Sequence, residues 1–299
     1  NIDFLGRTNI TTLLSFFLIS AGIISMVLNG GPKLSIDFKG GTLIAVNYTE
    51  PVNIEKIRSE LSSVLIDGQS FNFSNAEIKY FGDESNIAVR IASMEEEPEQ
   101  FSKKFSDKLA SIFPNLVPVD KNNFILSVEK VGPKVGAELS SDALMAILSA
   151  LLLILIYVSV RFEFKYAVGA IAALVHDVLI TIGVFSILGY EISLAVIAAF
   201  LTIVGYSLND TIVIFDRVRE NVKTTKNAPM KNIINQSINE SLSRTIITSL
   251  TTFFVVLILF LFGGEVIHTF SFAMIVGVLI GTYSSIFVAS PVVIKMDSK

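Results

Sequence analysis

The chain has 299 residues, of which 52% are hydrophobic and 17% are charged, and its formal net charge is −4. A soluble domain carries about a quarter charged residues, so this composition excludes a purely soluble protein, and the small net charge does not suggest a nucleic-acid partner. The absence of cysteine excludes disulfides, thiolate metal sites and cysteine nucleophiles, and two histidines are too few for a histidine-rich metal site.

Six segments are long and apolar enough to cross a bilayer, which takes about 20 mostly apolar residues. They cover residues 10–28, 143–160, 166–188, 193–215, 245–262 and 267–294. The first lacks a convincing cleavage site, so we expect a retained helix and not a signal peptide. The last is longer than one span requires, so we expect it to tilt or to extend past the bilayer.

The distribution of Lys and Arg predicts the orientation of these helices. The short connections 189–192 and 263–266 contain neither residue, whereas the opposite side carries many. The basic residues on that side are Arg7, Arg161, Lys165, Arg217, Arg219, Lys223, Lys226, Lys231, Lys295 and Lys299. We therefore expect both termini and the connection 217–240 to be cytoplasmic. Residues 1–29 then hold the N-terminus and first helix, 30–138 an exported domain, and 139–299 the remaining five helices.

The exported stretch alternates between element types. Residues 41–48, 76–81, 87–91 and 123–129 are predicted strands, and residues 52–66 and 95–113 are predicted helices. The first of these helices would bury a stripe formed by Ile54, Ile57, Leu61 and Leu65. The order βαββαβ indicates a ferredoxin-like α+β domain. We interpret the acidic run 95–97 as a solvated helix start in preference to a calcium site.

Ionisable residues inside the apolar segments are the candidate functional residues, because a charge at bilayer depth is costly and tends to mark function. Asp177 lies about 16 Å along its helix from the cytoplasmic edge, Asp210 lies roughly 10 Å in, and Arg244 about one turn in. A buried carboxylate that pairs with an arginine stays ionised, and it takes up a proton when the partner leaves. These three residues therefore form a candidate proton relay, with Asn209, Ser207, Thr248 and His176 as supporting polar groups.

Other interpretations of the same residues stay open. Asp210 and Arg244 could form a static ion pair that only fixes helix packing, and His176 or backbone groups could hold Asp177 in place. His176 fits a packing or hydrogen-bonding role better than proton transfer, and Asp216 fits an interfacial role beside Arg217 and Arg219.

Glycines give a second indication of how the helices pack. Gly277 and Gly281 have the G-x-x-x-G spacing that allows close helix contact, and Gly205 and Gly183 are further candidates for packing positions. The polar faces of the third to fifth helices imply a bundle interior, and five helices around a polar centre would close it poorly. We therefore expect a partner membrane subunit.

Several motifs occur in order along nearly the whole chain. Asp37, Gly40, Gly41 and Thr42 belong to the D-F-x-G-G-T motif of residues 36–42, with a lysine at the variable position. The other motifs are V-G-P-K-V-G at 131–136, Y-V-S-V-R-F-E-F at 157–164, A-L-V-H-D-V at 173–178, V-G-Y-S-L-N-D-T at 204–211, F-D-R-V-R-E-N at 215–221 and S-R-T-I-I-T at 243–248. In these motifs the chain resembles the SecD/SecF family of the resistance-nodulation-division superfamily, and within it the SecF branch.

The resemblance implies a bacterial inner-membrane protein that pairs with SecD in a twelve-helix unit. It also implies association with the SecYEG channel, export of unfolded polypeptides pushed in by SecA, and use of the proton gradient. YajC and YidC are further candidate partners. In this family an acidic residue and an arginine serve proton transport, and their motifs place them at Asp210 and Arg244. Protons would be the coupling ion, with no bound cofactor.

Two other classes of function remain as alternatives. A stand-alone efflux transporter of the same superfamily would normally carry two copies of the six-helix unit, and this chain has no internal repeat. A structural scaffold for SecD would not move protons. An enzyme is not expected, because the chain contains no P-loop, nucleophile elbow or zinc-ligand pattern.

Overall fold

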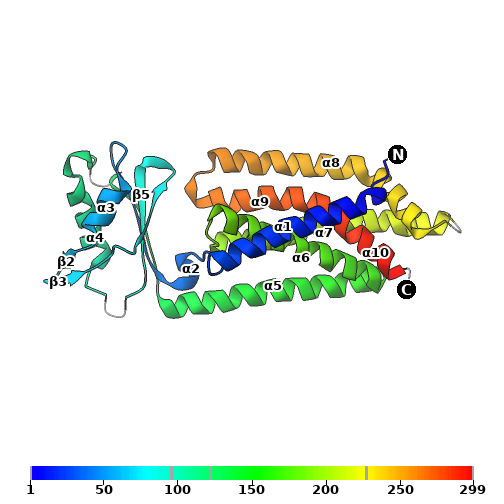
Figure 1. Ribbon diagram of the computed structural model, residues 1–299, viewed down its shortest axis with the longest axis horizontal. Helices are drawn as coiled ribbons and strands as arrows, with labels where there is room; N and C mark the ends of the chain where they lie inside the picture. Colours follow the sequence, from blue (N-terminus) through cyan, green and yellow to red (C-terminus); the bar gives the residue numbers. More distant parts are fainter. Residues whose placement is uncertain (1, 95–96, 121–122, 226–227, 298–299) are drawn as a thin grey trace. The chain divides into compact units, whose positions relative to one another are not determined.

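The computed structural model describes residues 2–94, 97–120, 123–225 and 228–297, with only the backbone at 265–266. The chain forms two compact units. One is a helical unit made from residues 1–33 and 143–299, and the other is a soluble-type α/β unit made from residues 34–142 (Figure 1).

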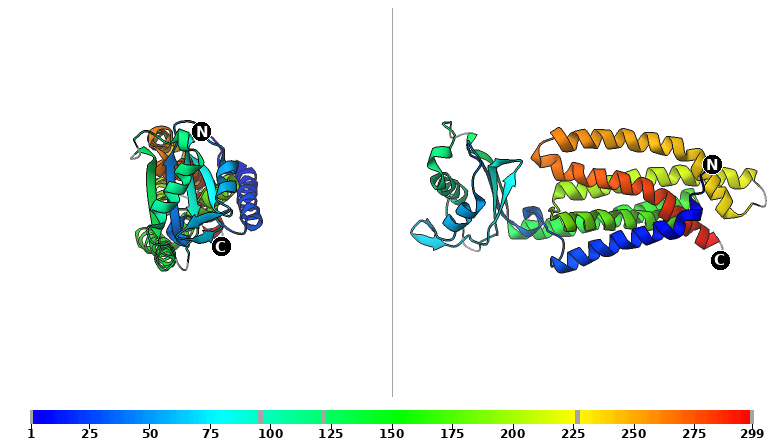
Figure 2. Two further views of the ribbon diagram at one scale, coloured as in Figure 1. Left: turned by 90° about the vertical axis from the view of Figure 1, so that its left-hand side faces the viewer. Right: turned by 45° about the horizontal axis from the view of Figure 1, so that its top comes forward.

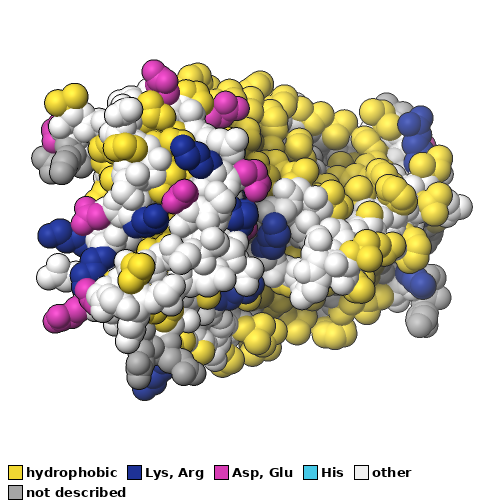
Figure 3. Space-filling view, turned by 60° about the vertical axis from the view of Figure 1, so that its left-hand side comes forward, with side chains coloured by type: hydrophobic (Ala, Val, Ile, Leu, Met, Phe, Trp, Pro, Cys, Tyr) yellow, Lys and Arg dark blue, Asp and Glu magenta, His cyan; other side chains and the backbone are white. Residues whose placement is uncertain are grey.

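The helical unit contains the predicted spans. Among the described residues, six helices are long and apolar enough to cross a membrane, which confirms the predicted number. Their elements are α1 (Thr8–Leu28), α5 (Pro133–Arg161), α6 (Phe164–Leu188), α7 (Leu194–Thr224), α8 (Met230–Phe262), and α9 (Glu265–Ser284) continued by α10 (Ser290–Asp297). Yellow apolar side chains cover most of the visible face of this unit, and the blue and magenta charged side chains lie mainly on the α/β unit and at one end of the helical unit (Figure 3).

Local sequence explains where two of these helices begin and end. Gly189, at φ +70, ends α6 in the left-handed conformation that glycine adopts without steric cost. The Ser193 hydroxyl then accepts a hydrogen bond from the Val196 amide and caps the start of α7. Small and capping residues thus produce the short connection between two antiparallel spans.

The cytoplasmic connection expected at 217–240 is mostly helical, which corrects that expectation. Helix α7 continues to Thr224 and α8 already starts at Met230. Arg217 bridges the two helices through an ion pair of 2.6 Å to Glu240, and the Asn221 amide donates to the same carboxylate. Polar contacts of this kind extend both helices beyond the length that the apolar pattern predicts.

The last span is not one uniform helix. Between α9 and α10, residues Ser285–Ala289 form a π-helical turn (η4). The Ser290 hydroxyl donates to the Ser285 carbonyl, five residues earlier, at 3.1 Å. Such turns are rare and often occur at functional sites. The apolar pattern of residues 267–294 gives no sign of this change.

The α/β unit has the predicted βαββαβ order, with an additional two-stranded hairpin at residues 64–71 that was not predicted. Its four-stranded sheet runs β4-β5-β1-β6, with β1 (Gly41–Asn47) antiparallel to both β5 (Asp83–Ile91) and β6 (Ile125–Val131). Strand β4 (Glu77–Phe81) pairs with β5. Helices α3 (Ile54–Glu60) and α4 (Phe101–Ile112) lie on one face of the sheet (Figure 2). This arrangement confirms the ferredoxin-like α+β prediction.

Two predicted helices are shorter than expected. The segment 52–66 is not one helix, because α3 ends at Glu60 and Val64–Ile66 forms β2, which pairs with β3 (Gln69–Phe71) in a hairpin. Asp67 and Gly68, both at positive φ, make the turn, and Leu65 is exposed instead of lying on the apolar stripe. Helix α4 starts at Phe101, and the acidic residues 95–96 lie outside the described residues. The last strand starts at Ile125 and not at 123.

Glycines of the D-F-x-G-G-T motif (36–42) and the V-G-P-K-V-G motif (131–136) lie where these two segments contact each other inside this unit. The short helix α2 (Ile36–Lys39) ends at Gly40, where a Cβ would lie 2.9 Å from the Cα of Pro133. A Cβ on Gly136 would lie 2.8 Å from the Phe38 carbonyl oxygen. Gly40 and Gly136 are needed because the two backbones are in direct contact here. Gly40 and Gly41 also have positive φ, which glycine adopts without steric cost. Thr42 follows them, buried in β1.

Candidate functional site

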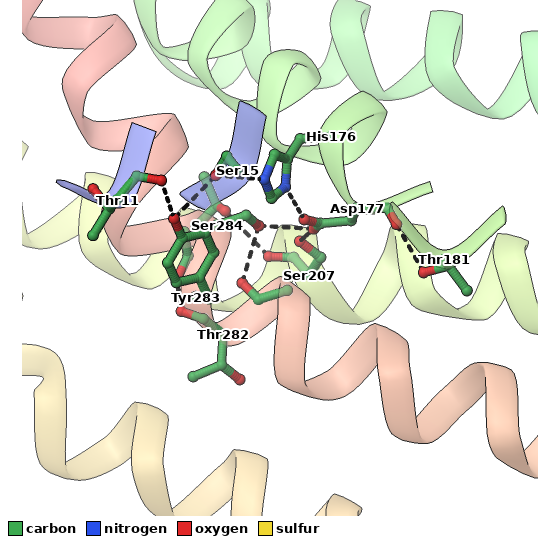
Figure 4. Close-up of polar contacts among 12 residues, drawn as sticks. Thr11, Ser15, His176, Asp177, Thr181, Ser207, Thr282, Tyr283 and Ser284 are labelled. Carbon is green, nitrogen blue, oxygen red and sulfur yellow. Dashed lines mark hydrogen bonds and ion pairs between the residues drawn. The ribbon is translucent and has the colours of Figure 1, made fainter. Parts of the chain in front are cut away.

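Asp177 is the most completely enclosed carboxyl group in the described bundle, with no exposed surface. The Ser207 hydroxyl of α7 donates to its Oδ2 at 2.6 Å, and the Ser284 hydroxyl of α9 donates to the same oxygen at 2.8 Å. The Nδ1 of His176 lies 2.9 Å from its Oδ1. Donors from three helices therefore surround one carboxyl group inside the membrane unit (Figure 4).

His176 extends this set of contacts to α1. Its Nε2 lies 2.9 Å from the hydroxyl of Ser15, and that hydroxyl lies 3.0 Å from the hydroxyl of Tyr283. The Tyr283 hydroxyl donates to the Thr11 carbonyl oxygen at 2.6 Å. Figure 4 shows these groups as one connected run between α6, α1 and α9. Adjacent residues of α6 thus face different neighbours: Asp177 faces α7 and α9, and His176 faces α1.

Glycines bring the helices close enough for these contacts. A Cβ on Gly281 would lie 3.0 Å from the Cβ of Ser207, and a Cβ on Gly277 would collide with the side chain of Ile203. The predicted G-x-x-x-G pair therefore lies directly against α7. Because α7 and α9 approach so closely there, both Ser207 and Ser284 can reach Asp177.

Asp210 lies one turn beyond Ser207 on α7 and is 2% exposed. The Ser249 hydroxyl of α8 donates to its carboxyl at a long 3.4 Å, and the Thr248 hydroxyl and the charge of Arg244, both on the same helix, also act on it. Ser249 also contacts the hydroxyl of Thr282 on α9 at 2.7 Å. Asp177 and Asp210 therefore differ sharply: three groups lie within 2.9 Å of the Asp177 carboxyl, whereas the Asp210 carboxyl has only weaker interactions, all with α8.

Arg244 does not pair with Asp210 in this structure. It lies on the exposed side of α8, and within the described part of the chain no carboxylate is at ion-pair distance from it. The Thr248 hydroxyl donates to the backbone carbonyl oxygen of Arg244 at 3.0 Å, one turn earlier on the same helix. The structure thus brings Asp177 and Asp210 into one interior and leaves Arg244 on the outer surface of the same bundle.

Two further predicted residues lie outside this interior. Asn209 is exposed on α7, and Gly205, one turn earlier, has open space around it, since a Cβ there would meet nothing within 4 Å. Neither Asn209 nor Gly205 makes a contact that supports the site among the residues that the structure describes. Asp216 pairs with Arg161 of α5 at 3.2 Å and not with Arg217 or Arg219.

Sequence reasoning missed the contribution of α1. Ser15, Tyr283 and Ser284 were not candidates, although a polar run at 282–285 interrupts an apolar segment and could have indicated the last two. The packing of α1 on α6 was also missed: a Cβ on Gly22 would lie 2.6 Å from the Cα of Gly183. One turn further, the hydroxyls of Ser25 and Ser186 lie 2.9 Å apart.

The N-terminal residues before α1 are also fixed to the bundle. Asn235 of α8 accepts hydrogen bonds from the amides of Phe4 and Leu5, at 2.9 and 3.3 Å. Asn239, one turn along, accepts from the Ile2 amide at 2.7 Å. Leu5 is buried in the bundle core. The segment before α1 is thus attached to the helix that carries Arg244.

Metal binding finds no support in the described residues, where no group of three or more His, Asp or Glu side chains could hold an ion. The polar atoms of the interior are instead hydroxyls, one imidazole and two carboxyls. Groups of this kind can accept, donate and pass protons.

Comparison with known proteins identifies the family. Residues 113–299 match the family described as "Protein export membrane protein SecD/SecF, C-terminal". The chain is also 46% identical, over its whole length and 95% of the relative, to the protein translocase subunit SecF of Calditerrivibrio nitroreducens. The chain belongs to the SecD/SecF family. It is similarly 43% identical to the SecF subunit of Thermodesulfovibrio yellowstonii, with 99% of this chain and 95% of that protein covered.

Solved structures of the SecD/SecF family have the same fold. The crystal structure of SecDF from Thermus thermophilus, titled a translocon-associated membrane protein, superimposes with a TM-score of 0.87 at 36% sequence identity. A second SecDF structure, in a super-membrane-facing form, gives a TM-score of 0.69. This chain corresponds to 39% of the SecDF chain. Family membership and the six apolar helices make it a multi-pass membrane protein.

Proposed function

We propose that this chain is a SecF-type subunit of a Sec protein-translocation complex, with SecD as its membrane partner, and that proton binding inside its bundle drives export. The translocation role follows from relatives named protein translocase subunit SecF over essentially the full chain. SecD as a partner is supported by the SecDF structure, of which this chain matches a part. SecYEG, and beyond it YajC and YidC, are the further partners that the family resemblance suggests.

The observation that carries the proton part of the proposal is the state of Asp210. This carboxyl group is almost fully buried and has only weak interactions with Ser249 and Thr248; within the described residues no cation is at ion-pair distance, although the charge of Arg244 already acts on it from further away. A buried charge without a partner is costly, so such a group gains a proton or gains a cation. Arg244, exposed on the adjacent helix α8, is the cation that a shift of α8 would bring nearer. Asp177 is the second carboxyl of this relay, and Ser207, which donates to it, lies three residues before Asp210 on α7.

A partner subunit is expected from the surface of α8. Arg244, Ser243 and Thr251 are exposed along this helix, and α1, α5 and α8 bury far fewer residues than α6, α7 and α9. A cation facing lipid is unfavourable, and intramembrane charges nearly always face protein or water. We therefore place SecD against α8, in an inner-membrane complex whose α/β unit is exported and whose termini are cytoplasmic.

The test is Asp210→Asn in cells that supply SecD, with Asp216→Asn as the matched control on the same helix. Asp216 is half-exposed and paired with Arg161, so its amide variant should keep export. Asp210→Asn should be expressed and co-purify with SecD but lose the proton-dependent part of export. Unchanged proton-dependent export in this variant would refute the relay.

Two alternatives predict different results. A scaffold that stabilises SecD without moving protons should tolerate the exchange of charges in an Asp210→Arg, Arg244→Asp double variant, whereas a relay should not. A stand-alone efflux transporter should purify from native membrane as a homo-oligomer, whereas a SecF-type subunit should bring SecD with it.

A further inference from the structure

The contacts from Asp177 to Thr11 form a continuous run of four. They join Asp177 Oδ1 to His176 Nδ1 (2.9 Å), His176 Nε2 to Ser15 Oγ (2.9 Å), Ser15 Oγ to Tyr283 OH (3.0 Å), and Tyr283 OH to the Thr11 carbonyl oxygen (2.6 Å). All four distances lie within the ordinary range for hydrogen bonds. Each bond needs one proton, so the number of protons in the run can be counted.

An ionised aspartate and a neutral histidine supply too few protons. A neutral imidazole carries one N–H, and the hydroxyls of Ser15 and Tyr283 carry one hydrogen each, which makes three donors for four contacts. The Thr11 carbonyl can only accept, so Tyr283 donates to it and Ser15 must donate to Tyr283. His176 must then donate from Nε2 to Ser15, and no second N–H is left for the contact with Asp177.

One additional proton completes the run. If it is on His176, both ring nitrogens donate, one to Asp177 and one to Ser15. If it is on Asp177 Oδ1, the carboxyl donates to Nδ1 and the imidazole donates from Nε2. The Ser207 and Ser284 hydroxyls donate to Oδ2 and are compatible with both forms.

We propose that Asp177 and His176 together form a proton-binding site that holds one proton in this conformation, and that this proton fastens α1 to α6 and α9. Loss of the proton leaves one contact of the run without a donor. Once Asp177 is ionised, its charge holds the single imidazole N–H at Nδ1, and the Ser15 hydroxyl turns to donate to Nε2. Tyr283 still donates to the Thr11 carbonyl, so the Ser15–Tyr283 contact between α1 and α9 is the one left without a donor. Helix α1 directly precedes the α/β unit in the chain, so the proton controls how firmly the segment leading to that unit is held.

The other ionisable groups around the dyad are few. Tyr283 of α9 is in direct contact through its stacking on the imidazole, with ring centroids 5.9 Å apart. Asp210 of α7 lies three residues beyond Ser207. Lys165 and Asp297 pair with each other at 2.8 Å, more than two turns of α6 away from the dyad. Among the described residues, α1 faces the dyad with hydroxyl and carbonyl groups only. The proton count does not depend on export, but a role for this proton in export rests on the proposed function.

15N NMR and infrared spectroscopy of the full chain in lipid nanodiscs test the number of protons in the run directly. The chain has two histidines, so 15N-histidine labelling gives two imidazoles, and His268→Gln identifies the signal of His176. At neutral pH the proposal requires either a doubly protonated imidazole at His176 or an infrared carboxylic-acid band that Asp177→Asn removes. A neutral imidazole together with an ionised Asp177 at neutral pH would overturn it.

Matched tyrosine variants separate the count from general effects of mutation. Tyr283→Phe removes two contacts and one donor, and the remaining two contacts are served by a neutral histidine and Ser15. Its dyad should therefore bind the extra proton roughly tenfold more weakly, the size of about one net hydrogen bond. Tyr206→Phe is the control, because the buried Tyr206 hydroxyl has no hydrogen-bond partner. Ser15→Ala leaves two contacts and two donors, and should weaken proton binding as Tyr283→Phe does.

The outcomes distinguish this site from the wider function. Equal proton binding in the parent and in Tyr283→Phe would refute the site. If Tyr283→Phe binds the proton more weakly but keeps full proton-dependent export, the site exists and its role in export is refuted. Failure of Asp210→Asn to impair export bears on the proposed relay alone, since the dyad is measured without any export assay.

Discussion

The crossing of α1 and α6 should be highly sensitive to a single methyl group. In Gly22→Ala the new Cβ would lie 2.6 Å from the Cα of Gly183, whereas carbon atoms in ordinary contact lie about 3.5–4.0 Å apart. Both atoms are on or close to backbone, so rotation of a side chain gives no relief. The two helices must therefore separate by about 1 Å at this level.

The separation should break the polar contact one turn away. The Ser25 and Ser186 hydroxyls are 2.9 Å apart, and about 1 Å more places them beyond the hydrogen-bond range of roughly 3.5 Å. Interhelical hydrogen bonds in membranes contribute about 0.6–1.7 kcal/mol, so the contacting state should lose roughly three- to twenty-fold in population.

Disulfide formation measures how closely the two helices approach at this level, because a cysteine pair keeps the crossing and replaces only the two hydroxyls. The chain has no cysteine, so a Ser25→Cys, Ser186→Cys pair reports only on this crossing. Cross-linking in the isolated subunit should slow on adding Gly22→Ala and slow further with Gly22→Leu. Gly205→Ala is the matched control, because that position has open space. Cross-linking of Gly22→Ala at the parent rate would show that the helices do not cross as described.

Three further outcomes are expected. Phe105→Ala should destabilise the α/β unit by about 3–5 kcal/mol, because this fully buried ring contacts Phe73 and Phe101. Leu65→Ala, at an exposed position, should change the free energy of unfolding by less than about 0.5 kcal/mol. Denaturant titration compares the two variants, and equal effects would contradict the assigned core. Burial opposes the ionisation of Glu77, but hydrogen bonds and charge from Lys79 and Arg90 outweigh it and lower its pKa below 4.5. The ionised carboxylate therefore stabilises the unit above about pH 4.5, and this contribution is lost as the pH falls through the folded-state pKa. Glu77→Gln should flatten the pH dependence of amide exchange in β4 and β5. If the variant kept the pH dependence of the parent, Glu77 would not be its source. Asn235→Leu should speed amide exchange at Phe4 and Leu5, whose amides it leaves without an acceptor. Asn239→Ala should speed exchange at Ile2 and leave exchange at Phe4 unchanged. If the Phe4 amide stayed protected in Asn235→Leu, the N-terminus would not be attached to α8 in this way.

Much of the fold could be predicted because it depends on local pattern. Apolar runs of sufficient length give the six spans, and alternation with turn residues gives the βαββαβ order. The errors occurred where a tertiary contact outweighs the local pattern. Residues 64–66 continue the apolar stripe of α3 but form a strand, because they pair with 69–71 across the Asp67-Gly68 turn. Helices α7 and α8 extend beyond their apolar segments because Arg217, Asn221 and Glu240 join them.

The sequence by itself determined which carboxyl groups lie in the membrane, since Asp177 and Asp210 fall within apolar segments whatever their neighbours. Only the tertiary structure decided which of them is satisfied. The partners of Asp177 come from residues 30 and 107 positions away, and those of His176 from α1, 161 positions away. Helix periodicity sets which face a residue occupies, but not which helix covers that face. That depends on how closely helices approach, and here glycine-to-backbone and glycine-to-serine contacts between separate segments set the distance.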